Sequence, residues 1–266
     1  MKIAIIGTGN LGKSIAKGLI TNNAITSLYL TKRNLEELED LDGYKNIFLT
    51  TDNQEAVKNS DILIFAVQPA HFEKILNDIK PLLTEKHTIV STITGFVIPK
   101  IEEEIGADKF IIRAMPNTAI AVGKSMTCIC SNTQGKKRVQ LAEAIFNRLG
   151  HSLVIPEAQM QAATVVCASG IAFWMRLIRA TTQAAIQLGF DAKEAQELAM
   201  FTSEGAANLL ITNGNHPEEE IDRVTTPKGC TITGLNEMEH KGLSSSLIQG
   251  MVASFNKISN IKKEQI

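Results

Sequence analysis

A glycine-rich turn joins an apolar strand pattern to a helix pattern at the start of this chain. Lys2–Ile6 is an apolar run of strand length, and the turn after it leads into a helical pattern that ends near Asn22. The turn consists of Gly7, Thr8, Gly9, Asn10, Leu11 and Gly12. Here the first glycine permits a tight turn, the second lets the backbone approach a diphosphate, and the third lets the helix pack closely on the strand. The sequence therefore predicts that these six residues bind a dinucleotide at a helix N-terminus.

The chain divides into an alternating part and a helical part. Strands are expected at residues 2–6, 27–30, 61–67, 88–92, 110–113, 126–130 and 152–155, with helices at 10–22, 34–41, 69–83, 99–105 and 136–149. This alternation predicts an α/β fold over residues 1–157, with an N-terminal Rossmann-type doubly wound parallel sheet. In residues 158–266 strand patterns vanish, and helices are expected at 157–188, 192–212, 230–239 and 242–257. Their many small apolar residues predict packing against another subunit.

Composition narrows the range of partners. With 27 Lys and Arg against 28 Asp and Glu, the net charge is −1, which gives no basic field for nucleic acid or an anionic membrane. The longest apolar runs, such as Ile62–Val67, are too short to span a bilayer. The glycine turn interrupts the N-terminal apolar run and no cleavage pattern follows, so we expect a cytoplasmic protein. The four scattered cysteines are expected to be reduced thiols, with no metal site.

Residues at the end of the second strand indicate which dinucleotide binds. An NAD site usually carries Asp or Glu here to bind the ribose 2′-hydroxyl. This chain instead reads Leu30, Thr31, Lys32, Arg33 and Asn34. Because a hydroxyl and two cations attract a 2′-phosphate, we expect NADP(H), with Arg33 as the planar partner and Thr31 and Lys32 assisting. The alternative is that Lys32 and Arg33 belong to an ordinary solvated loop.

Further strand ends are expected to complete the cofactor groove, because ligands bind beyond the carboxyl ends of parallel strands. One strand ends in Ala66, Val67, Gln68 and Pro69. Thr94 follows the next strand, and Asn117, whose amide suits a carboxamide, follows the one after that. An ordinary strand-ending turn is the alternative at each of these positions.

A second polar turn, Val224–Thr231, lies in the helical half and leads into another helix pattern. Free N–H groups and the positive end of the helix dipole at such a helix start suit a small carboxylate. We predict that the N–H groups of Gly229, Cys230 and Thr231 hold a substrate carboxylate, with Thr226 shaping the pocket. The alternative is an ordinary capped helix, with Thr231 as the capping residue.

These segments, in order along nearly the whole chain, resemble pyrroline-5-carboxylate reductases. Arg113–Thr118 is similar to the family's Arg-x-Met-Pro-Asn-Thr motif, and Val224–Thr231 to its Val-Ser-Ser-Pro-Gly-Gly-x-Thr motif. Ala66–Pro69 resembles its Ala-Val-Lys-Pro, and Ala168–Phe173 its Gly-Ser-Gly-Pro-Ala-Tyr. The first two motifs are the specific ones, whereas the phosphate loop is shared with many dehydrogenases.

The resemblance implies NADPH-dependent reduction of 1-pyrroline-5-carboxylate to L-proline, the last step of proline biosynthesis. It implies a Rossmann domain (1–157) and a helical dimerisation and substrate domain (158–266), forming a homodimer that sometimes assembles into decamers. Asn53 matches an asparagine near the adenosine ribose, and Glu157 matches an acidic substrate-site residue. Thr226 and Thr231 match hydroxyls of the substrate site. We expect Thr231 to hydrogen-bond the ring nitrogen, with Thr226 as its catalytic neighbour.

The chain departs from the family pattern at several positions. Lys228 replaces the first glycine of a pair, Arg223 stands where asparagine is common, and Gln68 replaces a lysine. Two alternatives stay open: a divergent reductase of a related cyclic imine, and a non-catalytic NADP-binding regulator. A hydroxyacid dehydrogenase is disfavoured, because those enzymes carry a catalytic lysine on the helix after a Ser-x-Gly-like motif. Between Gly170 and Lys193 this chain has no lysine.

Overall fold

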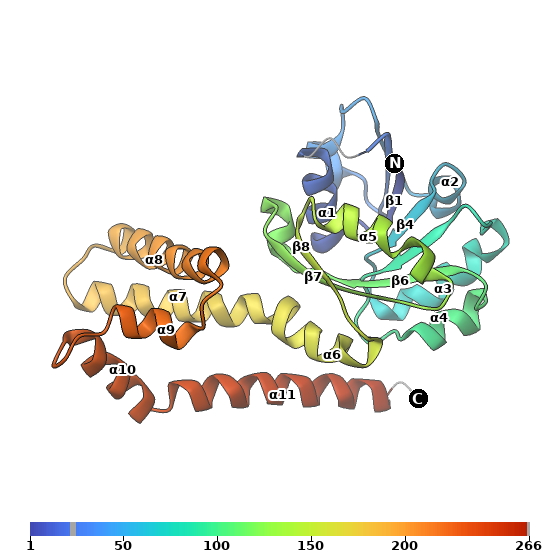
Figure 1. Cartoon of the computed structure of the whole chain (residues 1–266). Helices are drawn as coiled ribbons and strands as arrows, with labels where there is room; N and C mark the ends of the chain where they lie inside the picture. The colour runs from blue at the N-terminus through green and yellow to red at the C-terminus, as the bar shows by residue number, and fades with distance from the viewer. Residues whose placement is uncertain (22–24, 265–266) are drawn as a thin grey trace. The chain divides into compact units, whose positions relative to one another are not determined.

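The chain forms two compact units. A computed structural model describes residues 1–21 and 25–264, with side chains as far as Ile258. The first unit comprises Met1–Ser169 and the residues from Lys257 onward, and the second comprises Gly170–Asn256. Figure 1 shows that the first unit holds the sheet, whereas the described residues of the second are helices and turns.

The strands of the first unit form one sheet. They are β1 (Lys2–Ile6), β2 (Ser27–Thr31), β3 (Ile47–Thr50), β4 (Ile62–Phe65), β5 (Thr88–Ser91), β6 (Phe110–Met115), β7 (Ser125–Ser131) and β8 (Gly150–Val154). Their order is β3-β2-β1-β4-β5-β6-β7-β8. All neighbours from β3 to β6 are parallel, β7 is antiparallel to β6, and β8 is parallel to β7. Ile5 on β1 pairs with Leu30 on β2 and with Ile64 on β4, which confirms the predicted doubly wound sheet.

Alternate residues of the strands build two separate cores. Because side chains on a strand alternate between its faces, Ile3 and Ile5 pack into one core, and Ala4 and Ile6 into the other. The first core is closed by α1 (Asn10–Thr21) and α5 (Val139–Phe146). The second is closed by α2 (Asn53–Lys58), α3 (Pro69–Ile79), α4 (Ile98–Ile105) and α6 (Met160–Ala163), as Figure 1 shows. Burial on both faces explains the near-continuous apolar runs of the central strands.

The structure also contains elements that the sequence patterns did not predict. β3 and α2 are only four and six residues long, too short for a periodic pattern. The helix expected at 34–41 is a 3-10 helix over Glu36–Leu41. The helix expected at 157–188 is divided into a 3-10 turn, α6, a π-helical turn Thr164–Ser169 and α7 (Gly170–Gln187). The apolar period does not reveal the extra residue of a π turn.

The second unit is built from α7 and four further helices. These are α8 (Ala192–Asn213), α9 (Pro217–Arg223), α10 (Cys230–His240) and α11 (Leu243–Glu264), whose last residues belong to the first unit. α8 begins at Asp191, whose carboxylate accepts the N–H groups of Lys193 and Glu194, and ends at Gly214 with a φ of 67°. α9 was not predicted, because its seven residues span only two turns.

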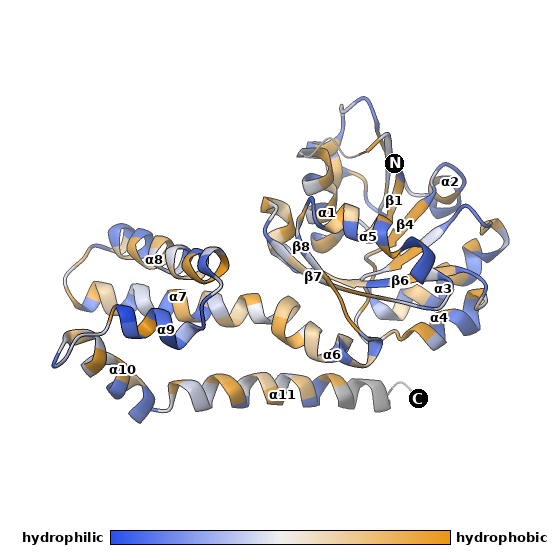
Figure 2. Ribbon diagram, viewed as in Figure 1, coloured by the Kyte–Doolittle hydropathy of each residue, from blue (hydrophilic) through white to orange (hydrophobic). Residues whose placement is uncertain are grey.

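Many large apolar side chains of the helical unit are exposed in the part of the chain that the structure describes. Trp174 on α7, Phe201 on α8 and Ile248 on α11 are 61%, 67% and 61% exposed. Figure 2 shows apolar residues along all three helices. Monomeric soluble proteins rarely expose so much apolar surface. By length and composition alone, the helical stretch Glu157–Gln187 could cross a membrane, since an 18-residue window within it has a mean hydropathy of 1.4. The expectation that the apolar runs are too short considered only uninterrupted runs and does not hold for this stretch.

His87 is a buried residue with a hydrogen bond at each ring nitrogen. Nδ1 accepts the backbone N–H of Thr84 at 2.9 Å, which places the proton on Nε2. Nε2 donates to the carbonyl oxygen of Val57, at the end of α2, at 3.2 Å. Burial lowers the pKa of His87 below its usual value, because a charged ring is disfavoured away from water.

We predict that the free energy of unfolding falls as the pH drops below about 6.5, the pKa of an unfolded histidine. In that range the unfolded chain binds a proton that folded His87 does not, so acid favours unfolding. His87→Gln should reduce this pH dependence, measured by urea unfolding at about pH 7.5 and pH 5.5. His151→Gln, at an exposed histidine, is the control and should keep the wild-type dependence. Equal dependence in His87→Gln and the wild type would contradict this assignment.

Candidate functional site

A cleft of about 710 Å³ opens at the carboxyl ends of β1, β2 and β4. Ligands of open α/β sheets bind at this edge. The predicted cofactor residues that line it are Gly7, Thr8, Gly9, Thr31, Lys32, Arg33, Asn53, Ala66, Val67 and Gln68. His71, Lys74 and Asp78 on α3 also line it. The sequence analysis missed these three, because a polar helix face beside a cleft looks the same in sequence as one in solvent.

The glycine turn has the geometry that its sequence predicts. Gly7 has a φ of 91°, a conformation that favours glycine, and a Cβ at Gly12 would lie 2.5 Å from the Gly7 carbonyl oxygen. A Cβ at Gly9 would meet nothing within 4 Å, so this side of the turn is open. The Thr8 hydroxyl is buried and makes no hydrogen bond with any described residue. An open backbone edge at a helix start, beside an unpaired hydroxyl, fits a diphosphate.

Thr31 anchors this turn to the end of β2. Its hydroxyl accepts the N–H of Gly7 at 3.2 Å, and its carbonyl oxygen accepts the N–H of Thr8 at 2.9 Å. Thr31 is also buried. The structure thus gives Thr31 a part in shaping the site, and its contact with a phosphate stays a prediction.

The two cations after β2 have different surroundings. Nζ of Lys32 lies 2.6 Å from the carboxylate of Glu37, which the sequence analysis missed. The hydrogen bond and charge of Lys32 lower the pKa of Glu37. Arg33 is exposed and forms no ion pair within the described part of the chain. Arg33 is therefore the cation left available to a phosphate, whereas Lys32 would have to leave Glu37.

Several predicted cofactor residues do not line the cleft. Asn10 and Leu11 start α1, Gly12 is buried beneath the turn, and Pro69 is the first residue of α3. Each lies in the first turn of a helix that follows a lining segment. Thr94 lines a second cavity. A direct cofactor contact by any of them stays a prediction.

Asn117 uses its amide within the protein. Oδ1 accepts the N–H of Ala119 at 2.9 Å, which caps the 3-10 helix Thr118–Val122, and Nδ2 donates to the carbonyl oxygen of Cys167 at 3.1 Å. These bonds connect the loop after β6 to the π-helical turn. The proposed contact with a carboxamide stays a prediction.

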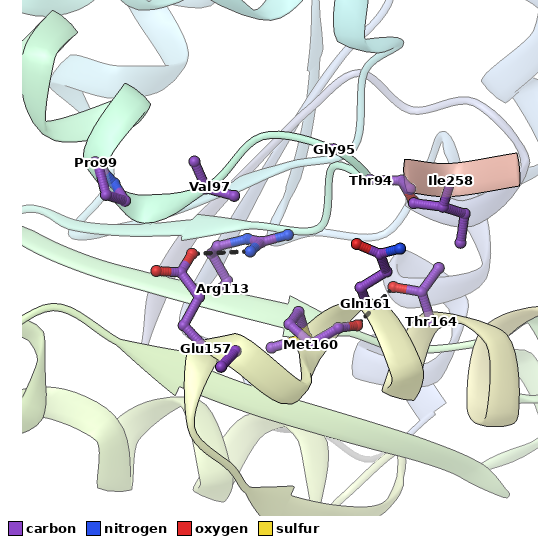
Figure 3. Close-up of a pocket in the computed structure, with 11 residues that line it drawn as sticks. Thr94, Gly95, Val97, Pro99, Arg113, Glu157, Met160, Gln161, Thr164 and Ile258 are labelled. Atoms are coloured by element: carbon purple, nitrogen blue, oxygen red, sulfur yellow. Dashed lines mark hydrogen bonds and ion pairs between the residues drawn. The ribbon is translucent and has the colours of Figure 1, made fainter. Parts of the chain in front are cut away.

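The second cavity lies within the first unit and has a volume of about 330 Å³. Figure 3 shows its lining, which comes from the segment after β5, from the start of α4, from β6, from α6 and the turns on either side of it, and from Ile258. Its polar side chains are Thr94, Arg113, Glu157, Gln161 and Thr164. The substrate-site prediction for Glu157 thus falls on a cavity wall, and Thr94 shares that cavity.

An ion pair forms one wall of this cavity. Arg113 is 5% exposed, and its Nη1 donates to Oε1 of Glu157 at 2.9 Å. The same oxygen accepts the N–H of Ile98, the first residue of α4, at 2.6 Å. Nε of Arg113 is buried and has no partner among the described residues. Because a buried cation requires a nearby anion, Arg113 and α4 together fix the carboxylate of Glu157.

The turn Val224–Thr231 lies in the second unit and leads into α10. Cys230 is the first residue of α10, so the N–H groups of Cys230 and Thr231 have no acceptor within the helix. The N–H of Gly229 instead donates to the carbonyl oxygen of Thr226 at 2.9 Å, which corrects the prediction that it is free for a carboxylate. Thr231 lies inside the first helical turn and not at the cap position, which is Gly229. Two amides and a hydroxyl therefore stay available to a ligand.

The charged residues beside this turn differ in their contacts. Arg223 lies 2.7 Å from the carboxylate of Glu220, which also accepts the amides of Asn213 and Asn215. The amides and Arg223 lower the pKa of Glu220. Lys228 is exposed and has a φ of 60°, in the left-handed region that favours the glycine it replaces. Lys228 thus departs from the family motif by placing a charged side chain on the exposed face of the turn.

Comparisons with known proteins cover both units. Residues 157–261 match a family described as pyrroline-5-carboxylate reductase dimerisation, and residues 2–95 match one described as NADP oxidoreductase, coenzyme F420-dependent. The chain is 42% identical over 274 residues to pyrroline-5-carboxylate reductase 2 of Dictyostelium discoideum, covering 97% of this chain and 92% of that protein. It is 44% identical over 275 residues to pyrroline-5-carboxylate reductase 1 of the same organism. That match covers 97% of this chain and spans 49%, about half, of the relative's length.

A solved structure supports the same relationship. The pyrroline-5-carboxylate reductase of Coxiella burnetii superposes with a TM-score of 0.89 at 28% identity, covering 97% of both chains. The Dictyostelium reductase 2 and the Coxiella reductase thus match this chain over almost the whole length of both chains. The matched range includes the sheet, the phosphate loop and the hydroxyl-bearing turn. The chain belongs to the pyrroline-5-carboxylate reductase family.

Proposed function

We propose that this chain catalyses the NADPH-dependent reduction of 1-pyrroline-5-carboxylate to L-proline. The observation that carries the proposal is the 42% identity to a pyrroline-5-carboxylate reductase across 97% of this chain. The reaction needs a hydride at the imine carbon and a proton on the ring nitrogen. The protein therefore has to orient the two reactants and place charge around them.

The cleft at β1, β2 and β4 is the proposed NADP(H) site. NADPH supplies the hydride when bound. Gly7–Gly12 would hold the diphosphate, with the unpaired hydroxyl of Thr8 nearby. Arg33 would pair with the 2′-phosphate, and Asn53 would lie near the ribose. The second cavity, with Thr94, extends the same sheet edge toward β6.

The substrate proposed is a five-membered cyclic imine that carries a carboxylate. The N–H groups of Cys230 and Thr231 bind the carboxylate, while the Thr231 hydroxyl hydrogen-bonds the ring nitrogen and holds its proton. Thr226 shapes the pocket beside Gly229. A protonated imine is a cation, and Glu157, whose charge is shared with Arg113, is the acidic residue proposed for the substrate site. No acid–base pair is required, because the protonated imine is already electrophilic.

A homodimer is proposed as the functional assembly. The dimerisation family match, residues 157–261, contains the exposed apolar side chains of α7, α8 and α11. A second copy of the chain would cover them, which also accounts for the apolar stretch Glu157–Gln187 without a membrane.

One observation favours a second candidate, the reduction of a related cyclic imine acid. Lys228 adds a cation to the exposed face of the turn at a position where the family has glycine. The kcat/KM ratio for the five-membered and six-membered cyclic imine acids separates the two candidates. A ratio above one supports pyrroline-5-carboxylate as the substrate, and a ratio below one supports the related ring.

Arg33→Asp is predicted to weaken NADPH binding by about tenfold to a hundredfold, because it removes a charge-assisted hydrogen bond worth roughly 1.5–3 kcal/mol. NADH binding should change little. Glu37→Gln frees Lys32 and should shift the preference further toward NADPH. Fluorescence titration of both cofactors measures these dissociation constants, with Arg148→Asp, at an exposed arginine outside the cleft, as control. An unchanged NADPH-to-NADH ratio in Arg33→Asp rules out the phosphate contact.

Thr231→Ala is predicted to lower kcat/KM by about tenfold to a hundredfold, the loss of one transition-state hydrogen bond. NADPH oxidation in the presence of 1-pyrroline-5-carboxylate measures it. Thr233→Ala is the matched control, since that hydroxyl already donates to the carbonyl oxygen of Gly229 at 3.0 Å, and it should keep activity. Wild-type kinetics in Thr231→Ala would remove this hydroxyl from the mechanism.

Light scattering of the purified chain is predicted to give the mass of a dimer or of a multiple of it. Phe201→Glu should shift the assembly toward monomers, because it places a charge in an apolar interface. Tyr44→Glu is the matched control, since Tyr44 is also exposed but lies outside residues 157–261. A monomeric wild-type chain at micromolar concentration would argue against the proposed assembly.

A further inference from the structure

Cys128 and Cys167 form a pair of neighbouring thiols that the proposed reaction does not use. Cys128 lies on β7 and Cys167 in the π-helical turn Thr164–Ser169, and their Sγ atoms are 3.8 Å apart. Cys128 is 4% exposed, whereas Cys167 is partly exposed. Cys167 therefore lies nearer to solvent than Cys128, and the two thiols are in contact.

The two thiols differ in acidity. The hydrogen bond from Cys128 lowers the pKa of Cys167 to about 7. The same hydrogen bond, together with burial, raises the pKa of Cys128. Because the thiolate is the reactive form of cysteine, Cys167 is the nucleophile at neutral pH and Cys128 keeps its proton.

We propose that Cys128 and Cys167 are a modification site, a dithiol that a peroxide oxidises to a disulfide. The Cys167 thiolate attacks one peroxide oxygen, the O–O bond breaks, and Cys167 becomes a sulfenic acid while hydroxide leaves and takes up a proton. The Cys128 sulfur then attacks the Cys167 sulfur, the S–O bond breaks, and the leaving hydroxide takes the Cys128 proton. The two thiols lose two electrons, the peroxide gains them, and two waters form.

The local structure allows the sulfur atoms to meet. A disulfide bond is about 2.05 Å long, so the sulfur atoms have to approach by roughly 1.8 Å. The π-helical turn that holds Cys167 interrupts the regular α-helical bonding, and a small shift there does not require the sheet to move. The carbonyl oxygen of Cys167 accepts a hydrogen bond from the side chain of Asn117, so a shift of Cys167 would also move the loop after β6.

The remaining cysteines provide an internal comparison. Cys130 is 2% exposed, and burial raises its pKa to about 11. Cys230 is exposed and, within the described part of the chain, has no thiol beside it. Neither combines a reactive thiolate with a neighbouring thiol, and the proposal does not depend on the proposed reductase activity.

Peptide mapping tests the proposal on the wild-type chain. The protein is treated with one equivalent of hydrogen peroxide, its remaining thiols are blocked with N-ethylmaleimide in denaturant, and it is digested without reduction. Mass spectrometry should find a Cys128–Cys167 linked peptide as the main crosslink, and dithiothreitol should abolish it. Cys130 and Cys230 should carry the blocking reagent. A main crosslink through Cys130 or Cys230, or no crosslink at all, would overturn the proposal.

Two variants separate the oxidation of Cys167 from the attack by Cys128. Cys128→Ala leaves no resolving thiol, so dimedone labelling of a sulfenic acid at Cys167 should rise severalfold over the wild type. Cys230→Ala is the matched control and should keep the Cys128–Cys167 crosslink. Equal dimedone labelling in Cys128→Ala and the wild type would contradict the resolving role of Cys128. The wild-type mapping stands even where a variant fails to fold.

Discussion

Close packing of the first helix on the first strand is the constraint on which the cofactor cleft depends. A side chain at Gly12 would meet the carbonyl oxygen of Gly7, so only glycine lets α1 lie this close to β1. Gly7 itself is crowded by Val67, which follows β4, and Thr31 on β2 accepts its N–H. Three neighbouring strand ends thus hold one turn in place. The cleft keeps its shape because these contacts hold the turn against the ends of the strands.

The ion pair between Arg113 and Glu157 gives the other end of the site a comparable anchor. It connects β6, the start of α4 and the turn after β8 through a single carboxylate oxygen. Breaking a buried pair by removing one partner typically costs about 3–5 kcal/mol, and the partial exposure of Glu157 reduces that figure here. Since Arg113 is buried and Glu157 borders the cavity, the pair fixes the position of the Glu157 carboxylate at the cavity wall, with its charge balanced by Arg113.

The sequence predicted the sheet and the phosphate loop because both are local patterns. Buried parallel strands give continuous apolar runs, and the glycine turn carries its own conformational requirement. Contacts that depend on the exact course of the backbone were not predictable: Glu37 beside Lys32, Ile98 on Glu157, and the hydrogen bond of the Gly229 amide to Thr226. The first and the last depend on local loop and turn geometry, whereas the contact between Ile98 and Glu157 depends on tertiary packing. The π-helical turn was missed for a different reason, since one extra residue leaves the apolar period almost unchanged.

The central claim is that this chain transfers a hydride from NADPH to 1-pyrroline-5-carboxylate. Its most direct test uses NADPH deuterated at C4 of the nicotinamide, with 1-pyrroline-5-carboxylate as substrate and product analysis by mass spectrometry and NMR. The predicted result is L-proline with one deuterium on the ring carbon that was double-bonded to nitrogen, and one NADPH oxidised per proline. Cofactor binding without labelled proline would contradict the claim.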